Sequence, residues 1–258
     1  MLLEVIELTK RFGGLTALSD VSFAIGTGEI VGIFGPNGSG KTTLLNLITG
    51  ILAPSAGRIL WKSTEIQGQS PHVIAAAGVV KTFQNPQLFL ELSIYDNVAI
   101  ASHLRLRRQY GLRRLAELLP WRDAARHSEV MQRVDRILAL CRLDSVRERT
   151  AAGLSYGQEK MLGVAMAMMC EPDLLLLDEP ASGLGEDEIR TLEEVLRDLR
   201  GAATTLCVID HKVDFLARVA DRAIALQQGL MIAQGAPAEV LHHPRVIEAY
   251  LGRHHARA

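Results

Sequence analysis

The chain has 258 residues, 48% of them hydrophobic, and a formal net charge of −1. This length and apolar content can bury a sizeable core, so the composition excludes a disordered chain, and the near-zero charge gives no basis for general nucleic-acid binding. The three cysteines, Cys141, Cys170 and Cys207, are odd in number and widely spaced, which excludes a disulfide framework and is typical of a reducing cytosol.

The N-terminal third is predicted to contain mainly strands. Met1–Leu8 alternates apolar and polar residues as a half-buried strand does, and it lacks the charged start of a secretion signal. Gly26–Gly28 is expected to turn the chain into a short apolar strand, Glu29–Phe34. The segment Thr43–Thr49 has Leu and Ile on one face and is predicted to be a helix.

Between that strand and that helix, Gly35–Thr42 fits the phosphate-loop pattern of Gly, four residues, Gly-Lys and Ser or Thr at every fixed position. Glycines allow backbone N–H groups to surround a polyphosphate, and the N-terminus of the helix adds partial positive charge. Lys41 can reach the β- and γ-phosphates, and the Thr42 hydroxyl can hold Mg²⁺. The residues expected to bind the nucleotide here are Gly35, Pro36, Asn37, Gly38, Ser39, Gly40, Lys41, Thr42 and Thr43.

The middle of the chain, from about residue 92 to residue 154, has helical patterning. Within it, Leu104–Arg114 carries five arginines. A solvated helix face is the simpler interpretation of this basic cluster, and attraction to anionic lipid or to an acidic partner is the alternative.

A second apolar run, Leu174–Glu179, ends in two carboxylates and is predicted to be a buried parallel strand. Ligands of open α/β sheets bind at the carboxyl ends of the strands, so both acids are expected near the phosphates. Asp178 is suited to the Mg²⁺ shell, and Glu179 could orient or deprotonate an attacking water. The apolar stretch Met161–Leu177 is interrupted by Glu171–Asp173, which predicts a helix, a turn and a strand, not a membrane span.

Leu154–Gln158, just ahead of the predicted helix Glu159–Cys170, resembles the Leu-Ser-Gly-Gly-Gln signature of the ATP-binding cassette (ABC) family, with Tyr156 at the third position. In that family the signature of one subunit completes the nucleotide site of a second. The resemblance therefore implies that Ser155 and Gly157 contact a γ-phosphate held by a partner cassette. Without the resemblance, Ser155 would be interpreted as an ordinary helix N-cap.

The remaining family motifs follow in the family's order over nearly the whole chain. Phe12 matches the aromatic residue that stacks on adenine, Gln84 matches the glutamine that senses Mg²⁺ and the attacking water, and His211 matches the histidine that contacts the γ-phosphate. Taken singly, these residues would be interpreted as a core Phe, a surface amide and a structural His. The resemblance implies ATP and Mg²⁺ as cofactors, with Lys41, Gln84, Glu179 and His211 catalytic and Thr42, Gln84 and Asp178 around the metal.

One position departs from the family pattern. Many cassettes carry Asp at the position of Gly185, where it helps to couple the two sites of the dimer. The resemblance does not carry this coupling over to the present chain. Hydrolysis is still expected, because a degenerate cassette would more typically lack one of Lys41, Asp178, Glu179 or His211.

Within the family, the chain is similar to the ATPase subunits of branched-chain amino acid importers. The similarity lies in the stretches Arg11–Leu18, Thr82–Phe89, Leu154–Gln158, Gly235–Val240 and Pro244–Gly252. It implies two membrane permease subunits, a second ABC ATPase that is identical or different, and indirectly a periplasmic or extracellular binding protein. The implied location is the cytoplasmic face of the inner membrane, as a peripheral protein. Closely related subunits serve urea or short-chain amide uptake, so the cargo stays open.

Two other classes remain as alternatives. A soluble ATPase of translation or DNA repair would usually carry two cassettes or a long coiled coil, whereas this chain has one phosphate loop and no sustained heptads. A regulatory module that does not hydrolyse ATP is disfavoured by Glu179. The pairs His242–His243 and His254–His255 lack a carboxylate or Cys at ligand spacing, so we expect no metal site there.

The predicted fold class is α/β: a P-loop NTPase core with a mostly parallel sheet, an antiparallel β portion and an inserted α-helical subdomain. The chain is expected to form a single ABC ATPase domain over residues 1–258. Its core would comprise residues 1–91 and 155–258, and the helical subdomain about 92–154.

Overall fold

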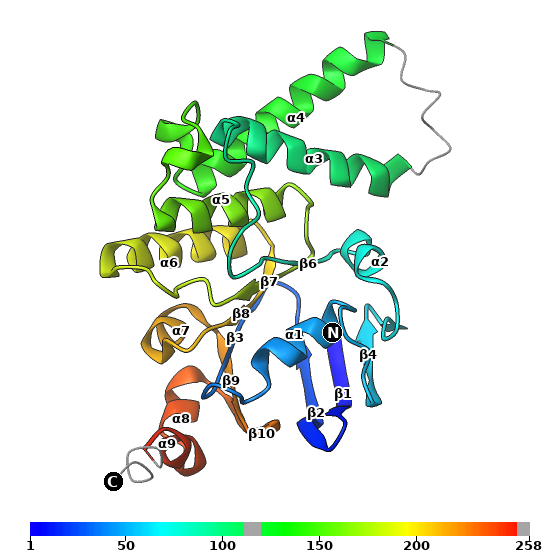
Figure 1. Ribbon diagram of the computed structural model, residues 1–258, viewed down its shortest axis with the longest axis vertical. Coiled ribbons are helices and arrows are strands. Elements are labelled where there is room, and N and C mark those ends of the chain that lie inside the picture. The colour runs from blue at the N-terminus through cyan, green and yellow to red at the C-terminus, as the bar shows by residue number, and fades with distance from the viewer. Residues whose placement is uncertain (111–119, 252–258) are drawn as a thin grey trace.

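The computed structural model describes residues 1–110 and 120–251, and side chains over residues 1–102 and 128–250. A four-stranded antiparallel sheet and a six-stranded sheet organise the molecule (Figure 1). The smaller sheet has the order β2-β1-β4-β5 and is built from β1 (Leu3–Phe12), β2 (Leu15–Ile25), β4 (Ala56–Trp61) and β5 (Thr64–Glu65).

The larger sheet has the order β10-β9-β3-β8-β7-β6. Its strands from β9 to β6 run parallel, and β10 is antiparallel to β9. The strands are β3 (Ile30–Phe34), β6 (Val79–Lys81), β7 (Leu174–Asp178), β8 (Thr205–Ile209), β9 (Arg222–Gln227) and β10 (Leu230–Gly235). Parallel strands need crossover connections, and here helices or a helical insertion supply them.

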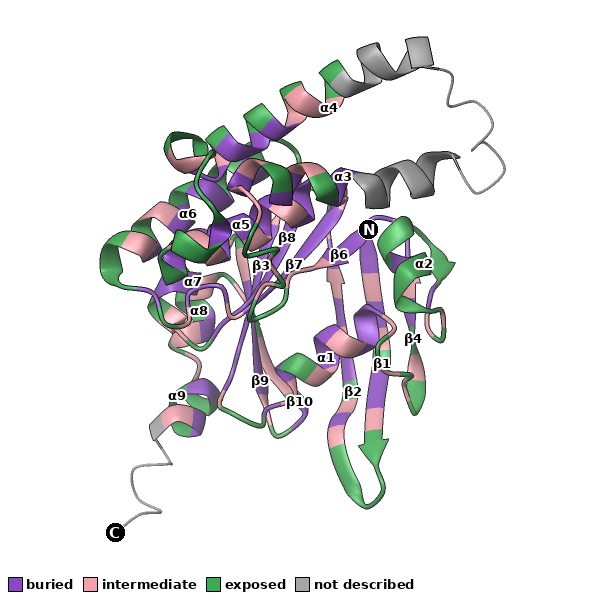
Figure 2. Ribbon diagram, turned by 45° about the horizontal axis from the view of Figure 1, so that its top comes forward, coloured by how far each residue is buried: buried purple, intermediate pink, exposed green. Residues whose placement is uncertain are grey.

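Strands β3, β7 and β8 are buried at every residue and mainly apolar, because both faces of the sheet are covered (Figure 2). Alternate residues of one strand enter two different cores: Leu175 and Leu177 pack with the helical side, while Leu174 and Leu176 pack with the phosphate-loop helix and the smaller sheet. The sheet is therefore the shared wall of two hydrophobic cores, and its strand ends are held in place from both faces.

The helices pack around the larger sheet and cover both of its faces (Figure 1). In chain order they are α1 (Lys41–Ile48), α2 (Pro71–Ala76), α3 (Ile94–Tyr110), α4 (Pro120–Leu140), α5 (Tyr156–Met168), α6 (Glu186–Gly201), α7 (Val213–Val219), α8 (Pro237–Leu241) and α9 (Pro244–Leu251), with 3₁₀ turns at Asp144–Val146 and Ala151–Gly153. Val134, Ile137 and Leu138 bury one face of α4, as their helical spacing predicts, and Cys141 is buried just after the helix ends.

This architecture confirms the predicted α/β class with its parallel core, antiparallel portion and helical insertion. The helix after the phosphate loop begins at Lys41, two residues before the predicted start, because Gly40 already occupies its N-cap position. Similarly, the helix after the signature begins at Tyr156 because Ser155 is its N-cap. The short helix α2 was not expected. Within the described residues, no helix has the length and apolar content needed to cross a membrane.

Candidate functional site

The candidate site lies where four neighbouring parallel strands end. The phosphate loop follows β3, His211 follows β8, Asp178 and Glu179 follow β7, and Gln84 follows β6. Since β3, β8, β7 and β6 are consecutive in the sheet, their carboxyl ends share one edge. The topology thus brings together residues that lie as far apart in the sequence as Gly35 and His211.

The phosphate loop is tightly packed and carries no acidic residue in the first turn of α1. Lys41 is only 6% exposed, and its Nζ donates to the carbonyl oxygens of Gly35 at 2.7 Å and Pro36 at 3.1 Å. Gly40 has a φ of +103°, and a Cβ there would lie 2.7 Å from the carbonyl oxygen of Ala17 on β2. The loop can therefore pass this close to β2 only with a glycine, and its amides remain available at the N-terminus of α1.

The buried carboxylate of Asp178 has a cationic neighbour that sequence reasoning assigned no role. Lys81 Nζ lies 3.0 Å from Asp178 Oδ2, and both side chains are 10% exposed. Lys81 also donates to Asn46 Oδ1 on α1 at 3.2 Å. The sequence offered only a lysine at the end of one apolar strand and an aspartate at the end of another. Their contact depends on the pairing of β6 with β7, which the local sequence does not reveal.

Glu179 is the centre of a polar cluster with Gln84 and His211. Gln84 Nε2 donates to Glu179 Oε2 at 3.0 Å, and His211 Nδ1 lies 3.9 Å from the same oxygen. The backbone of Glu179 has a φ of +50°, a costly conformation for a non-glycine residue, and its N–H donates to Ile209 O at 2.7 Å. The structure thus brings together three of the residues predicted to be catalytic.

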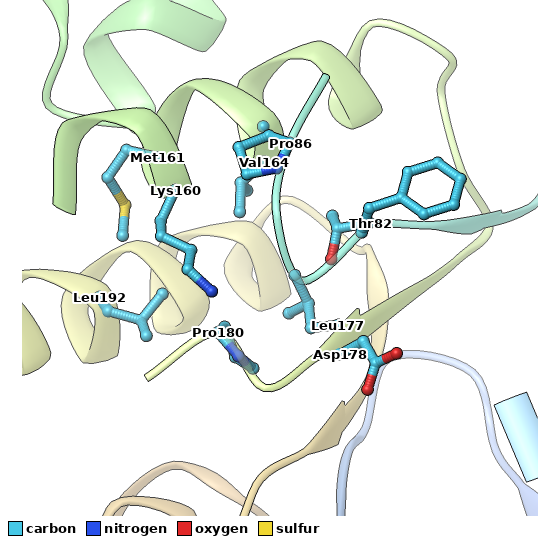
Figure 3. A pocket seen from close by; sticks show the side chains of 11 residues that line it. Thr82, Pro86, Lys160, Met161, Val164, Leu177, Asp178, Pro180 and Leu192 are labelled. Atoms are coloured by element: carbon cyan, nitrogen blue, oxygen red, sulfur yellow. The ribbon is translucent and has the colours of Figure 1, made fainter. Parts of the chain in front are cut away.

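Lys160 is a second lysine that sequence reasoning missed. It lies in the second turn of α5, and its side chain points toward Pro180 (Figure 3). Lys160 is 6% exposed and donates to the carbonyl oxygens of Gln84 and Glu179. A lysine in a helix normally reaches solvent, so nothing in the local sequence distinguishes this one.

The loop that carries Gly185, residues 181–185, is anchored by the segment around His211. Ala181 N donates to the buried carboxylate of Asp210 at 2.9 Å, and Lys212 Nζ donates to Leu184 O at 3.0 Å. Gly185 N donates to Glu188 Oε2 at 3.0 Å. Although Asp is absent at position 185, the loop is held by polar contacts within the same subunit.

The signature forms a helix cap. Ser155 Oγ accepts from Gln158 N at 3.2 Å, and Gln158 Oε1 accepts from Ser155 N at 3.1 Å. Gly157 packs against Glu188, where a Cβ would lie 2.3 Å from Oε1, and the Tyr156 ring covers Gly183. Among the described residues no hydrogen bond joins Ser155 or Gly157 to the phosphate loop, so one subunit does not bring these predicted ligands together.

Phe12 lies at the exposed end of the β1–β2 hairpin and is 45% exposed. Lys10 Nζ lies 4.9 Å from the centroid of its ring and donates to Ala53 O at 2.7 Å. The same hairpin contacts the phosphate-loop region, since Ser19 N donates to Gly229 O and Gly229 N donates to Ser39 O. Phe12 is not a core residue here, and an aromatic face is open to a ligand.

Two groups of residues that the sequence analysis singled out lie in parts of the chain whose side chains the structure does not describe. The side chains of the basic cluster within Leu104–Arg114 and of His254–His255 lie outside the described residues. Over the described part of the chain, no group of three or more His, Cys, Asp or Glu side chains could hold a metal by itself.

The chain is similar to known proteins over nearly its whole length. Residues 18–182 match the model of the ABC transporter family, and residues 231–256 match that of the branched-chain amino acid ATP-binding cassette transporter family. The high-affinity branched-chain amino acid transport ATP-binding proteins BraF of Pseudomonas aeruginosa and LivG of Escherichia coli are each 38% identical to this chain, over 97% of it and 98% of their own length. A probable LivG of Archaeoglobus fulgidus is 32% identical over 97% of this chain and 95% of its own.

A solved structure has the same fold over nearly the whole length. The ADP conformation of MJ1267, an ATP-binding cassette of an ABC transporter, superposes with a TM-score of 0.82 at 29% identity and covers 97% of this chain and 98% of its own. The phosphate loop, the paired acids and the signature thus occur in a chain that is similar to cassette ATPases from end to end. This chain belongs to the ABC transporter family and is an ATP-binding, ATP-hydrolysing cassette.

Proposed function

We propose that this chain energises an importer of branched-chain or related amino acids by hydrolysing ATP, while separate membrane subunits form the pathway. The observation that carries the proposal is the convergence of the phosphate loop, Asp178, Glu179, Gln84 and His211 on one sheet edge. The near full-length similarity to LivG and BraF and the matched C-terminal segment support the choice of cargo.

The donor set fits a magnesium ion. Asp178 offers a carboxylate on a side chain that is 10% exposed, and the ammonium of Lys81 beside it is a group that a divalent cation could replace. Thr42 and Gln84 supply the hydroxyl and amide oxygens that Mg²⁺ accepts as ligands. Bound there with the nucleotide, Mg²⁺ would neutralise charge on the β- and γ-phosphates.

The other side chains of the site would bind the phosphates, orient the attacking water or bind the adenine. Lys41 would exchange its carbonyl partners Gly35 and Pro36 for phosphate oxygens, and the loop amides would hold the same group. Glu179 would orient and polarise the attacking water, held in place by Gln84, and His211 would stabilise charge on the transferred phosphoryl group. Phe12 would stack on the adenine. No covalent intermediate is required.

A complete site would need a second cassette facing the first head to tail. Ser155 and Gly157 lie at the N-terminus of α5, which suits an anion, but no described contact joins them to the phosphate loop of their own subunit. The partner's phosphate loop would supply the γ-phosphate. Whether the partner is a second copy or a different ATPase does not alter this chemistry.

Membrane subunits would dock beside the segment on either side of Gln84, residues 83–90. Phe83, Phe89 and Leu90 are exposed there at 59%, 50% and 51%, an apolar group that suits a short helix of a permease. Cassette closure would then move the helical subdomain and pull on the permease. The chain would then act at the cytoplasmic face of the membrane, and a substrate-binding protein would act from the other side.

The experiment is an affinity pull-down of the Glu179→Gln variant from its own cell membranes in the presence of ATP, with the same variant without nucleotide as the control. Recovery of two multi-span membrane proteins and a second cassette supports an importer ATPase. Uptake of labelled leucine by vesicles containing the recovered complex supports the cargo, and uptake of urea or a short amide in its place would reassign it. Recovery of ribosomes or repair factors without membrane proteins would overturn the transporter function.

A further inference from the structure

The side chain of Lys160 is buried at the junction of the two loops that carry Gln84 and Glu179. It extends from α5 toward Pro180, into a pocket that Thr82, Leu177 and Asp178 also line (Figure 3). Its Nζ donates to Gln84 O at 2.7 Å and to Glu179 O at 3.2 Å. One ammonium group thus joins a helix to the backbones of both residues.

Burying the ammonium of Lys160 costs free energy, because the group loses its hydration and, among the described residues, gains no carboxylate partner in return. Lys160 is 6% exposed, and no described Asp or Glu forms an ion pair with it. Its neighbours are two backbone carbonyls and the ring of Tyr156, whose centroid lies 5.2 Å away. Carbonyl dipoles and an aromatic face only partly replace water, so Met or Leu would fill the same space at lower cost if packing were the sole requirement.

The residues that Lys160 holds are themselves constrained. The backbone of Glu179 is in the left-handed region at φ +50°, which persists only where surrounding contacts enforce it. Its N–H is held by Ile209 O, and its C=O is held by Lys160. The side chains of Gln84 and Glu179 meet at 3.0 Å on the other side of this junction.

We propose that Lys160 is a positioning residue for ATP hydrolysis. By bridging the carbonyls of Gln84 and Glu179, its ammonium fixes the two side chains relative to each other and couples both to the start of α5, which the signature caps. A movement of α5 is thereby transmitted to the water-orienting groups without any contact between α5 and the nucleotide of the same subunit. The inference rests on the proposed roles of Gln84 and Glu179.

The test compares Lys160→Met with wild type. Methionine keeps the length and the packing but removes both hydrogen bonds, so we expect kcat to fall roughly ten- to a hundredfold, as small misplacements of catalytic groups do. Affinity for a fluorescent ATP analogue should stay within about twofold, because the phosphate loop is not touched. Hydrogen exchange should increase in peptides covering residues 82–86 and 179–182 and should not change in α6. Lys160→Arg, which retains donors, should recover part of kcat.

Lys62→Met is the matched control, since this lysine is 51% exposed and lies on a turn of the smaller sheet. If Lys160→Met proves too unstable to purify, Lys160→Leu, which likewise removes both hydrogen bonds, takes its place with the same expectations. A wild-type kcat in that variant together with an inactive Glu179→Gln would overturn the positioning role and leave the proposed catalytic function intact. A wild-type rate in Glu179→Gln would instead overturn the catalytic function itself.

Discussion

The ammonium of Lys81 lies 3.0 Å from the carboxylate of Asp178, with both side chains 10% exposed. Lys81 ends β6 and Asp178 ends β7, and the contact with Asn46 extends the link to α1. In this arrangement a protein cation sits beside the carboxylate proposed to receive Mg²⁺. The nucleotide-free protein therefore carries no uncompensated charge at this position.

Replacing Lys81 by methionine tests this compensation. Removing one partner of a buried pair leaves an uncompensated charge, so the free energy of unfolding of the nucleotide-free protein should fall by roughly 3–5 kcal/mol. Mg-ATP should stabilise the variant more than it stabilises wild type, because the metal restores a cation beside Asp178. Urea unfolding with and without Mg-ATP measures both effects. Equal stability of variant and wild type without ligand would rule out the compensation.

Glu179→Gln tests the assignment of the water-orienting group. The amide preserves the size of the side chain and removes its charge, so turnover should fall about 10²- to 10⁴-fold while nucleotide affinity changes little. Phosphate release and titration of a fluorescent nucleotide measure the two quantities. Glu186→Gln is the control, since that side chain is 91% exposed and lies on the first turn of α6. Hydrolysis at a wild-type rate would show that another group performs the role.

Gly183→Ala probes the contact between the signature and the following loop. A Cβ at this position, where φ is +78°, would lie 2.6 Å from Cε1 of Tyr156. We expect a loss of roughly 2–3 kcal/mol in the free energy of unfolding, from backbone strain and overpacking together. Adding Tyr156→Gly should restore the part of the unfolding free energy that is lost to overpacking, while the part lost to backbone strain remains. Gly13→Ala, with φ +55° and no atom within 4 Å of its Cβ, measures the backbone strain alone. If the double variant Gly183→Ala/Tyr156→Gly is no more stable than Gly183→Ala, the contact between Gly183 and Tyr156 is contradicted.

The thiols should differ in reactivity. Burial raises the pKa of Cys141 and of Cys207 from 9.0 to about 12, whereas Cys170 is partly exposed. At pH 8 a maleimide should label Cys170 far faster than the other two, and urea should remove the difference. Because the folded-state pKa values are raised, the stability they contribute is fully present below pH 9 and is lost as the pH rises toward 12. Labelling of Cys207 in the native protein at the rate of Cys170 would contradict its burial.

Local sequence signals predicted much of the fold because their physical causes are local. Strand β7 begins at Leu174, as predicted, and ends at Asp178, one residue before the predicted end, since a strand covered on both faces leaves a continuous hydrophobic segment. The phosphate loop was equally accessible, because its glycines and lysine are contiguous. Helix α2 escaped prediction because Ile74 is its one buried residue, too few to create a periodic pattern.

The contacts that escaped prediction depend on distant pairing. Lys81 meets Asp178 because β6 pairs with β7 in a register that places Lys81 opposite Leu176, and nothing near either residue encodes that register. The burial of Lys160 is similarly invisible, since a lysine followed by an apolar helix face usually points to solvent. Motifs predict which residues touch the nucleotide, whereas the residues that hold them in position are identified only from the folded structure.

The packing of Gly157 against Glu188 affects how genetic data on the signature should be interpreted. Any side chain at position 157 must displace Glu188, which would release the N-terminal cap of α6 at Gly185. A substitution at Gly157 that abolishes transport would therefore have two effects. It would destabilise the subunit that carries it, and it would also weaken the contact between the two cassettes. Ser155, whose side chain is exposed, is the better position at which to isolate the effect on the contact between the cassettes, provided the small cost of its lost cap is measured on the isolated subunit.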